Sequence, residues 1–244
     1  MNSDIVDLRA FYASMLGRLA ERSITAALSA IWAGLPNERL VGLGYTLPWL
    51  ERFGADAERV FAFMPATQGA VAWPPAGPSA TALVFDEELP LVDASIDRFL
   101  LVHSLEHAEN PRETLNEIWR ALSPAGRVVI VAPNRRGVWA RLDTTPFGHG
   151  RPYSRSQINQ LLRETWFTPT GWSEALYVPP IDRGWFLRSA FAWERTGYTL
   201  SAPFAGVHLV EAVKQVYRAA PARRVKKRRL VPTLEPALAP SPGA

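Results

Sequence analysis

The stretch Arg127-Val-Val-Ile-Val-Ala132 is the strongest strand signal in the sequence, because it is continuous and rich in β-branched residues. A second apolar run, Asp97-Arg-Phe-Leu-Leu-Val102, precedes it, and the amphipathic segment 111–122 between them predicts a helix that opens with a proline. Strands this apolar are buried on both faces when helices cover a parallel sheet. The two runs therefore predict the centre of an α/β fold with a mostly parallel sheet.

The alternation of strands and helices continues on both sides of this centre. We predict strands at 39–44, 59–64, 80–85, 168–178 and 206–213, and helices at 4–32 (one long or two short), 46–54, 154–166 and 185–195. Ser3, Thr46 and Ser154 are expected to cap their helices. Residues 65–78 and 133–153 are expected loops. Because strands alternate with helices, we expect helices to cover both faces of the sheet.

Composition narrows the class of protein. The chain has 244 residues, of which 48% are hydrophobic and 20% charged, enough for one sizeable core. No apolar run approaches bilayer length, and Asp4 and Asp7 lie where a targeting segment would be basic, so we expect a cytoplasmic protein without a membrane span. The absence of cysteine excludes disulfides, thiolate zinc sites and cysteine nucleophiles.

The positive charge is concentrated at the C-terminal end. The formal net charge is +4, but residues 1–217 carry 20 basic and 22 acidic residues whereas residues 218–244 carry 7 and 1. We therefore predict one domain at 1–217, with an N-terminal helical segment at 1–36, and a disordered, basic, proline-rich tail at 218–244. Such a tail either contacts a polyanion weakly through phosphates or is a solvated extension without a specific role.

Several motifs around the two central strands follow a recognisable order. They are Asp93-Ala-Ser-Ile-Asp97, His103-Ser-Leu-Glu-His107, Glu117-Ile-Trp-Arg-Ala-Leu122 with Pro124 and Gly126, and Pro133-Asn134. This order resembles the signature of class I S-adenosylmethionine (SAM)-dependent methyltransferases, specifically the type 11 branch, over roughly residues 83–166. The resemblance implies a Rossmann-like seven-stranded sheet and methyl transfer from SAM to an unidentified, small-molecule acceptor.

The resemblance also implies where SAM would bind, over the exit of the first strand and against the exit of the fourth. The implied cofactor-binding residues are Gly42, Gly44, Tyr45, Thr46, Asp86, Glu87, His103, Leu105 and His107. The family's acid-x-Gly-x-Gly-x-Gly motif keeps only Gly44 here, and no acid occurs from Arg59 to Phe85, where the ribose-binding residue is expected. An alternative is therefore a binding or regulatory protein that keeps the fold without the donor.

The loop at 133–153 is expected to hold the acceptor. Its arginines and aromatic residues suit an anionic or aromatic molecule, and the candidates are Arg135, Arg136, Trp139, Arg151 and Tyr153, with His149 as the candidate general base. The alternative interpretation is that these arginines face solvent or cap helices. A further alternative is a nucleic-acid methyltransferase recruited by the basic tail.

The segment His103-Ser-Leu-Glu-His107 also fits the H-x-x-E-H pattern of inverted zinc peptidases. In those enzymes the two histidines bind the metal from one long helix. Here the pattern leaves a strand, so we predict no metal site.

Overall fold

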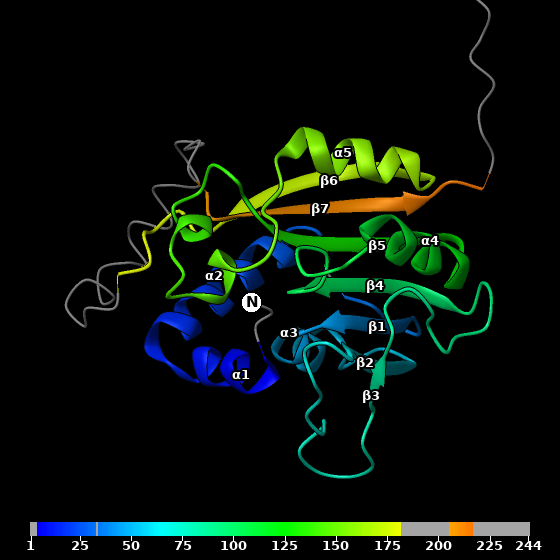
Figure 1. Cartoon of the computed structure of the whole chain (residues 1–244). Helices are drawn as coiled ribbons and strands as arrows, with labels where there is room; N and C mark the ends of the chain where they lie inside the picture. Colours follow the sequence, from blue (N-terminus) through cyan, green and yellow to red (C-terminus); the bar gives the residue numbers. More distant parts are fainter. Residues whose placement is uncertain (1–3, 33, 182–204, 217–244) are drawn as a thin grey trace, which may run out of the picture.

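The structure is a computed structural model of the chain and describes residues 4–32, 34–181 and 205–216. Its centre is a seven-stranded sheet of order β3-β2-β1-β4-β5-β7-β6 (Figure 1). The strands are β1 (Arg39–Gly44), β2 (Arg59–Pro65), β3 (Thr81–Val84), β4 (Ile96–Val102), β5 (Leu122–Pro133), β6 (Phe167–Ala175) and β7 (Val207–Lys214). The first five are parallel, and β7 runs antiparallel between β5 and β6.

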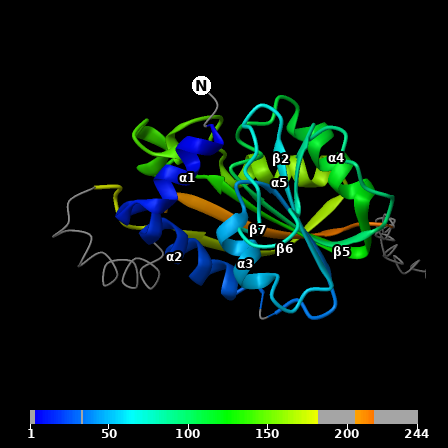
Figure 2. The ribbon, with the colours of Figure 1, turned by 90° about the horizontal axis from the view of Figure 1, so that it is seen from below.

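Helices cover both faces of this sheet, which confirms the predicted fold class (Figures 1 and 2). One face packs against α1 (Ile5–Ala13), α2 (Met15–Ser29) and α3 (Leu47–Phe53), and the other against α4 (Pro111–Ala121) and α5 (Arg155–Glu164). Neighbouring residues of a strand contribute to opposite cores, as Leu40 and Val41 do in β1. This alternation explains why the central strands are apolar throughout.

The two strands that dominate the sequence pattern are neighbours in the sheet. Phe99 pairs with Val128 and Leu101 with Ile130, and all four side chains are buried. β5 is longer than predicted, because the chain stays extended from Leu122 onward instead of looping before Arg127. The helix before it ends at Ala121.

The N-terminal segment forms two helices. The cap of α1 is Asp4, whose carboxylate accepts from the amide of Val6 at 2.9 Å, so the prediction of Ser3 was wrong. The chain turns at Ser14, which caps α2 through the amide of Gly17. A side chain at Gly17 would collide with the carbonyl of Phe11, so only glycine permits this close turn.

Two other caps and two predicted segments complete the comparison. Ser154 forms a full capping box with Gln157, as expected, whereas Thr46 precedes α3 without a side-chain capping bond. The predicted helix at 185–195 and the basic tail at 218–244 lie outside the described residues. Among the helices that the structure describes, none has both the length and the apolar character needed to cross a membrane.

Candidate functional site

The carboxyl ends of the parallel strands form the edge where open α/β sheets bind ligands. In Figure 1 the arrowheads of β1 and β4 point to this edge, beside α1. At the end of β1, Gly44 has a φ of +87°, and a side chain there would collide with the carbonyl oxygen of Val102. A side chain at Gly42 would collide with the hydroxyl of Thr46. These glycines serve close packing within the chain and do not leave an open cradle.

Aromatic side chains pack together at the end of β1, next to Gly44 in the sequence. Tyr12 of α1 stacks on Tyr45 with ring centroids 5.1 Å apart and an angle of 10° between the rings, and its ring also meets the edge of Trp49. Tyr12 and Tyr45 are both 5% exposed. Burial, with Tyr45 adding to it, raises the pKa of Tyr12 well above its usual value, so its phenol stays protonated at neutral pH.

Tyr12 also reaches the exit of β4. Its hydroxyl lies 2.8 Å from Nε2 of His103, a fully buried residue in the left-handed region at φ 52°. The side-chain amide of Gln68 donates from Nε2 to the backbone carbonyl of His103 at 2.6 Å. The ring centroid of Phe147 lies 4.7 Å from that of the imidazole. His103 is therefore held from three sides in a backbone conformation that few residues adopt, a combination common at functional sites.

A cavity of about 170 Å³ opens beside this cluster, at the ends of β2, β3 and β4. Its lining is Pro65, Thr67, Phe85, Asp86, Glu87, Ser104, His107, Ala108 and Glu109. Of the predicted cofactor-binding residues it brings together Asp86, Glu87 and His107. The others, Gly42, Gly44, Tyr45, Thr46, His103 and Leu105, do not line it.

The cavity tests how well the residues fit SAM. Pockets for ligands of this size measure about 300–1,000 Å³, so the cavity of about 170 Å³ takes only part of the molecule. The exposed ring of Phe85 and the carboxylate of Asp86 suit the adenine half, and Asp86 is held by a bond from Thr114 Oγ1 at 3.1 Å. The cavity does not take the methionine half, and at the end of β1 the rings of Tyr12 and Tyr45 are stacked and buried.

Three ionisable side chains converge behind the cavity. His103, Glu106 and His107 each offer a ligand atom, and these atoms lie within 4.8 Å of one another. Nδ1 of His103 is 3.4 Å from Oε1 of Glu106, a contact without hydrogen-bond geometry. Glu106 was absent from the predicted site residues, although the spacing His-x-x-Glu-His contained the signal.

The pKa directions follow from burial and from the mutual charges of this cluster. Burial alone would raise the pKa of Glu106, but His103 and His107 outweigh it, so the pKa of Glu106 lies below its usual value. Burial lowers the pKa of His107 in spite of Glu106. At neutral pH the cluster therefore holds an ionised carboxylate beside a neutral imidazole.

The predicted acceptor loop lies against the same strand exit. The amide of Arg151 donates to the carbonyl of Glu106 at 2.8 Å, and the hydroxyl of Tyr153 donates to the carbonyl of Leu105 at 3.2 Å. Burial raises the pKa of Tyr153 to about 12. His149 is half-buried near His107.

The remaining acceptor candidates point in different directions. The side chains of Arg135 and Arg136 are exposed. Trp139 is 1% exposed and donates its indole N–H to the carbonyl of Val178 at 2.7 Å. Trp139 therefore supports the loop from the core, away from the cavity.

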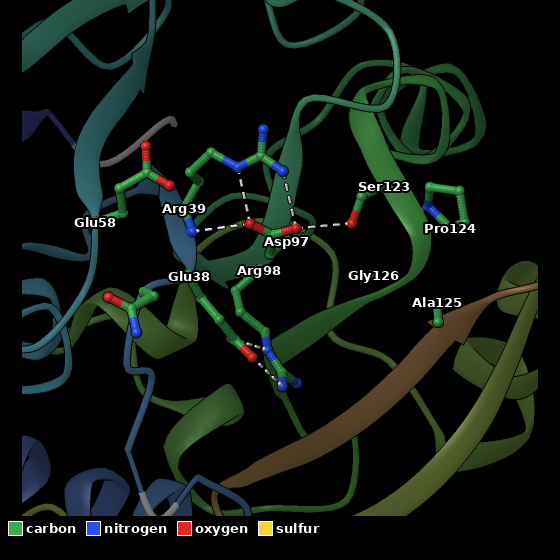
Figure 3. A pocket seen from close by; sticks show the side chains of 10 residues that line it. Glu38, Arg39, Glu58, Asp97, Arg98, Ser123, Pro124, Ala125 and Gly126 are labelled. Carbon is green, nitrogen blue, oxygen red and sulfur yellow. Dashed lines mark hydrogen bonds and ion pairs between the residues drawn. The ribbon is translucent and has the colours of Figure 1, made fainter.

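A larger pocket of about 420 Å³ lies at the opposite, amino-terminal edge of the sheet (Figure 3). Its side chains are already paired: Arg39 makes two bonds to Asp97, at 2.8 and 3.0 Å, and Ser123 donates to the same carboxylate at 2.9 Å. Arg98 likewise pairs with Glu38. This pocket is a rim of mutually satisfied ion pairs, so the smaller cavity is the better candidate for a ligand.

Comparisons with known proteins bear on the fold. Residues 41–130 match the family model described as "Methyltransferase domain". No curated protein matches the sequence.

Solved structures share the fold at low sequence identity. A SAM-dependent methyltransferase from Thermotoga maritima is 16% identical, with a TM-score of 0.58 over 86% of this chain and 96% of that one. A SAM-dependent methyltransferase from Mesorhizobium loti is also 16% identical, with a TM-score of 0.55 over 79% and 98%. The [4+2]-cyclase SpnF is 18% identical, with a TM-score of 0.58 over 82% and 84%. These likenesses establish the fold, which by itself does not fix the reaction.

Proposed function

We propose that this chain, which carries a methyltransferase domain at residues 41–130 in the class I methyltransferase fold, transfers a methyl group from SAM to a small-molecule acceptor. One observation carries the proposal: the cavity at the ends of β2, β3 and β4 lies where this sheet order binds ligands. It brings together Asp86 and Glu87, which follow β3, and His107, which follows β4.

Different regions of this site would hold the two halves of SAM. The adenine half would lie in the cavity, where Phe85 offers an exposed ring face and Asp86 an acceptor for the exocyclic amine. Tyr12 of α1 stacks on Tyr45 beside the implied site of the methionine half. We therefore expect donor binding to displace the ring of Tyr12.

The residues of the chain position the acceptor and exclude water, which is most of what methyl transfer to a nucleophile requires. Tyr153 and Arg151 attach the acceptor loop to the exit of β4 by their bonds to Leu105 and Glu106. The exposed Arg135 and Arg136 attract an anionic acceptor. His149, half-buried near His107, takes a proton from the acceptor where one is released.

Calorimetric titration with SAM and with its demethylated product tests the donor site. We expect one molecule bound per chain, and weaker binding for Asp86→Asn, which loses the acceptor for the adenine amine. Glu88→Gln is the matched control, because Glu88 is exposed and does not line the cavity. Absence of binding at millimolar donor would overturn the proposal and favour a protein that keeps the fold without the donor.

The acceptor is tested by release of the demethylated product in the presence of anionic or aromatic small molecules. With an acceptor in hand, His149→Gln is expected to lower kcat, since it removes the group that takes the acceptor's proton. An unchanged kcat would remove His149 from this role. Nucleic-acid methylation that disappears when residues 218–244 are deleted would instead favour a tail-recruited enzyme.

A further inference from the structure

The buried cluster behind the cavity has a composition that methyl transfer does not use. Two imidazoles and one carboxylate, from His103, His107 and Glu106, place their ligand atoms within 4.8 Å of one another. The sequence spacing alone did not predict this convergence, because the residues lie in a turn and not on a helix. The left-handed conformation of His103 and the bonds from the amides of His107 and Ala108 to the carbonyl of Ser104 bring the three side chains together.

The second observation is that these buried atoms lack hydrogen-bond partners. Among the described residues, both oxygens of Glu106, both ring nitrogens of His107 and Nδ1 of His103 are buried without one. The side chain of Glu106 is 1% exposed and that of His103 is fully buried. Buried charges in proteins are paired and hydrogen-bonded or coordinate metals, and a carboxylate with neither oxygen bonded is otherwise unfavourable.

We propose that His103, Glu106 and His107 bind a divalent transition-metal ion, with zinc as the reference ion. Two imidazoles and one carboxylate suit Zn²⁺, Fe²⁺ or Co²⁺, whereas Mg²⁺ and Ca²⁺ prefer oxygen ligands throughout. Ligand atoms about 2.0–2.2 Å from a tetrahedral zinc ion lie about 3.3–3.6 Å from each other. Metal binding therefore requires the side chains to converge from the observed separations of up to 4.8 Å.

The surroundings of the cluster match those of known metal sites. A metal-ligating histidine usually makes a hydrogen bond through its other ring nitrogen, which fixes its orientation. His103 has this arrangement, since Nε2 is bonded to the hydroxyl of Tyr12 and Nδ1 faces Glu106. The carbonyl of Glu106 accepts from the amide of Arg151, which fixes the backbone that carries the carboxylate.

The cluster adjoins the cavity. His107 and Ser104 line the cavity of about 170 Å³, so a water or a small oxygen ligand would reach the metal past these two residues. Three protein ligands with one open position are the arrangement of catalytic rather than structural zinc sites. His103 and His107 are also among the residues that the resemblance places around SAM, but His103 and Glu106 do not line the cavity, so metal binding can be measured without the donor.

The test is metal binding by the purified full chain without SAM. The apoprotein is titrated with Zn²⁺ by calorimetry and with Co²⁺ by absorption, where coordinated Co²⁺ gives bands that free Co²⁺ lacks. We expect one equivalent bound and a rise in Tm on addition of zinc. Glu106→Gln and His107→Asn are expected to weaken binding at least a hundredfold and to abolish the rise in Tm.

The matched control is His208→Asn. His208 is another buried histidine with a carboxylate beside it, Glu174 at 3.2 Å, but within the part of the chain that the structure describes it has no third candidate ligand. This variant should bind zinc as the parent does. Circular dichroism verifies folding, and if Glu106→Gln does not fold, His107→Asn carries the test.

Two outcomes would overturn the proposal. The first is the absence of stoichiometric binding by the parent chain at tenfold excess of either ion. The second is equal binding by the parent and the ligand variants, which would assign the metal to other residues. Because no donor is present, neither outcome bears on the proposed methyl transfer.

Discussion

Charged side chains are paired at the amino ends of the strands, whereas at the carboxyl ends a buried carboxylate lacks hydrogen bonds. Strand β4 contributes residues to both edges of the sheet. At its amino end, Asp97 pairs with Arg39, and Arg98 pairs with Glu38 (Figure 3). Beyond its carboxyl end, His103 and Glu106 are buried deeper, yet the carboxylate of Glu106 has no hydrogen bond among the described residues. The amino edge is internally satisfied and the carboxyl edge is not, so the same strand ends in a stabilising rim on one side and in a candidate site on the other.

The largest expected effect is at the carboxyl edge, where Tyr12→Ala removes a buried ring that contacts Tyr45, Trp49 and His103. We expect a loss of about 3–5 kcal/mol in the free energy of unfolding, measured by urea denaturation. The same variant should bind SAM more tightly, because it removes the ring that donor binding is expected to displace.

Tyr12→Phe is the control, since it keeps the ring and removes only the hydroxyl. It should lower the free energy of unfolding by about 1 kcal/mol. It should also weaken zinc binding about tenfold, because the bond to His103 is lost. If the two variants were equally stable, the aromatic packing at this edge would not be what holds α1 in place.

The next effect isolates close packing between β1 and β4. Gly44→Ala adds a side chain that meets the carbonyl of Val102 while φ is +87°, so we expect a loss of about 2–3 kcal/mol, read from the urea midpoint. Gly77→Ala is the control, because Gly77 has φ +92° with open space around it. A loss as large for Gly77→Ala would attribute the effect to backbone strain alone.

A smaller effect is expected at the amino edge. Asp97→Asn weakens the pair with Arg39, which is partly exposed, so we expect a loss of about 1 kcal/mol at neutral pH after allowance for solvent screening. The bonds from Arg39 lower the pKa of Asp97 in the folded state. The stabilisation is therefore complete above the unfolded pKa of about 3.9 and is lost as the pH falls through the lower, folded value.

Urea denaturation between neutral pH and acid checks this sign. The parent should have a larger free energy of unfolding than Asp97→Asn at neutral pH, and this difference should disappear only in the acid range. An advantage that persisted unchanged below the folded pKa would show that the carboxylate charge is not the source.

The smallest effect separates binding from stability. Phe85→Ala truncates a ring that is 73% exposed, so the free energy of unfolding should change by less than about 0.5 kcal/mol. The affinity for SAM should fall, because the ring lines the cavity. A variant with parental affinity would remove Phe85 from the adenine site.

The order of elements could be predicted from sequence because it follows from periodicity and caps. The runs at 97–102 and 127–132 are strands β4 and β5, and Ser154 caps its helix as predicted. The boundaries were less accurate, as at β5, since an extended segment beside a neighbouring strand needs no β-branched residues.

The candidate site was less predictable, because its parts come from distant segments. Tyr12 was assigned only to a helix, but its ring stacks on Tyr45, which lies far along the sequence. Glu106 was noted only as part of the His-x-x-Glu-His motif and was not predicted as a site residue. A sequence does not show which side chains end up buried without hydrogen-bond partners.

The sequence by itself determined the alternation of strands and helices, and with it the parallel sheet, because local patterns of apolar residues select those elements. Only the tertiary structure decided what happens at the end of the sheet. There, Tyr12 of α1 packs on Tyr45, and a turn after β4 brings the ligand atoms of His103, Glu106 and His107 within 4.8 Å of one another. Contacts between segments far apart in the chain depend on how whole elements pack, and no local pattern encodes them.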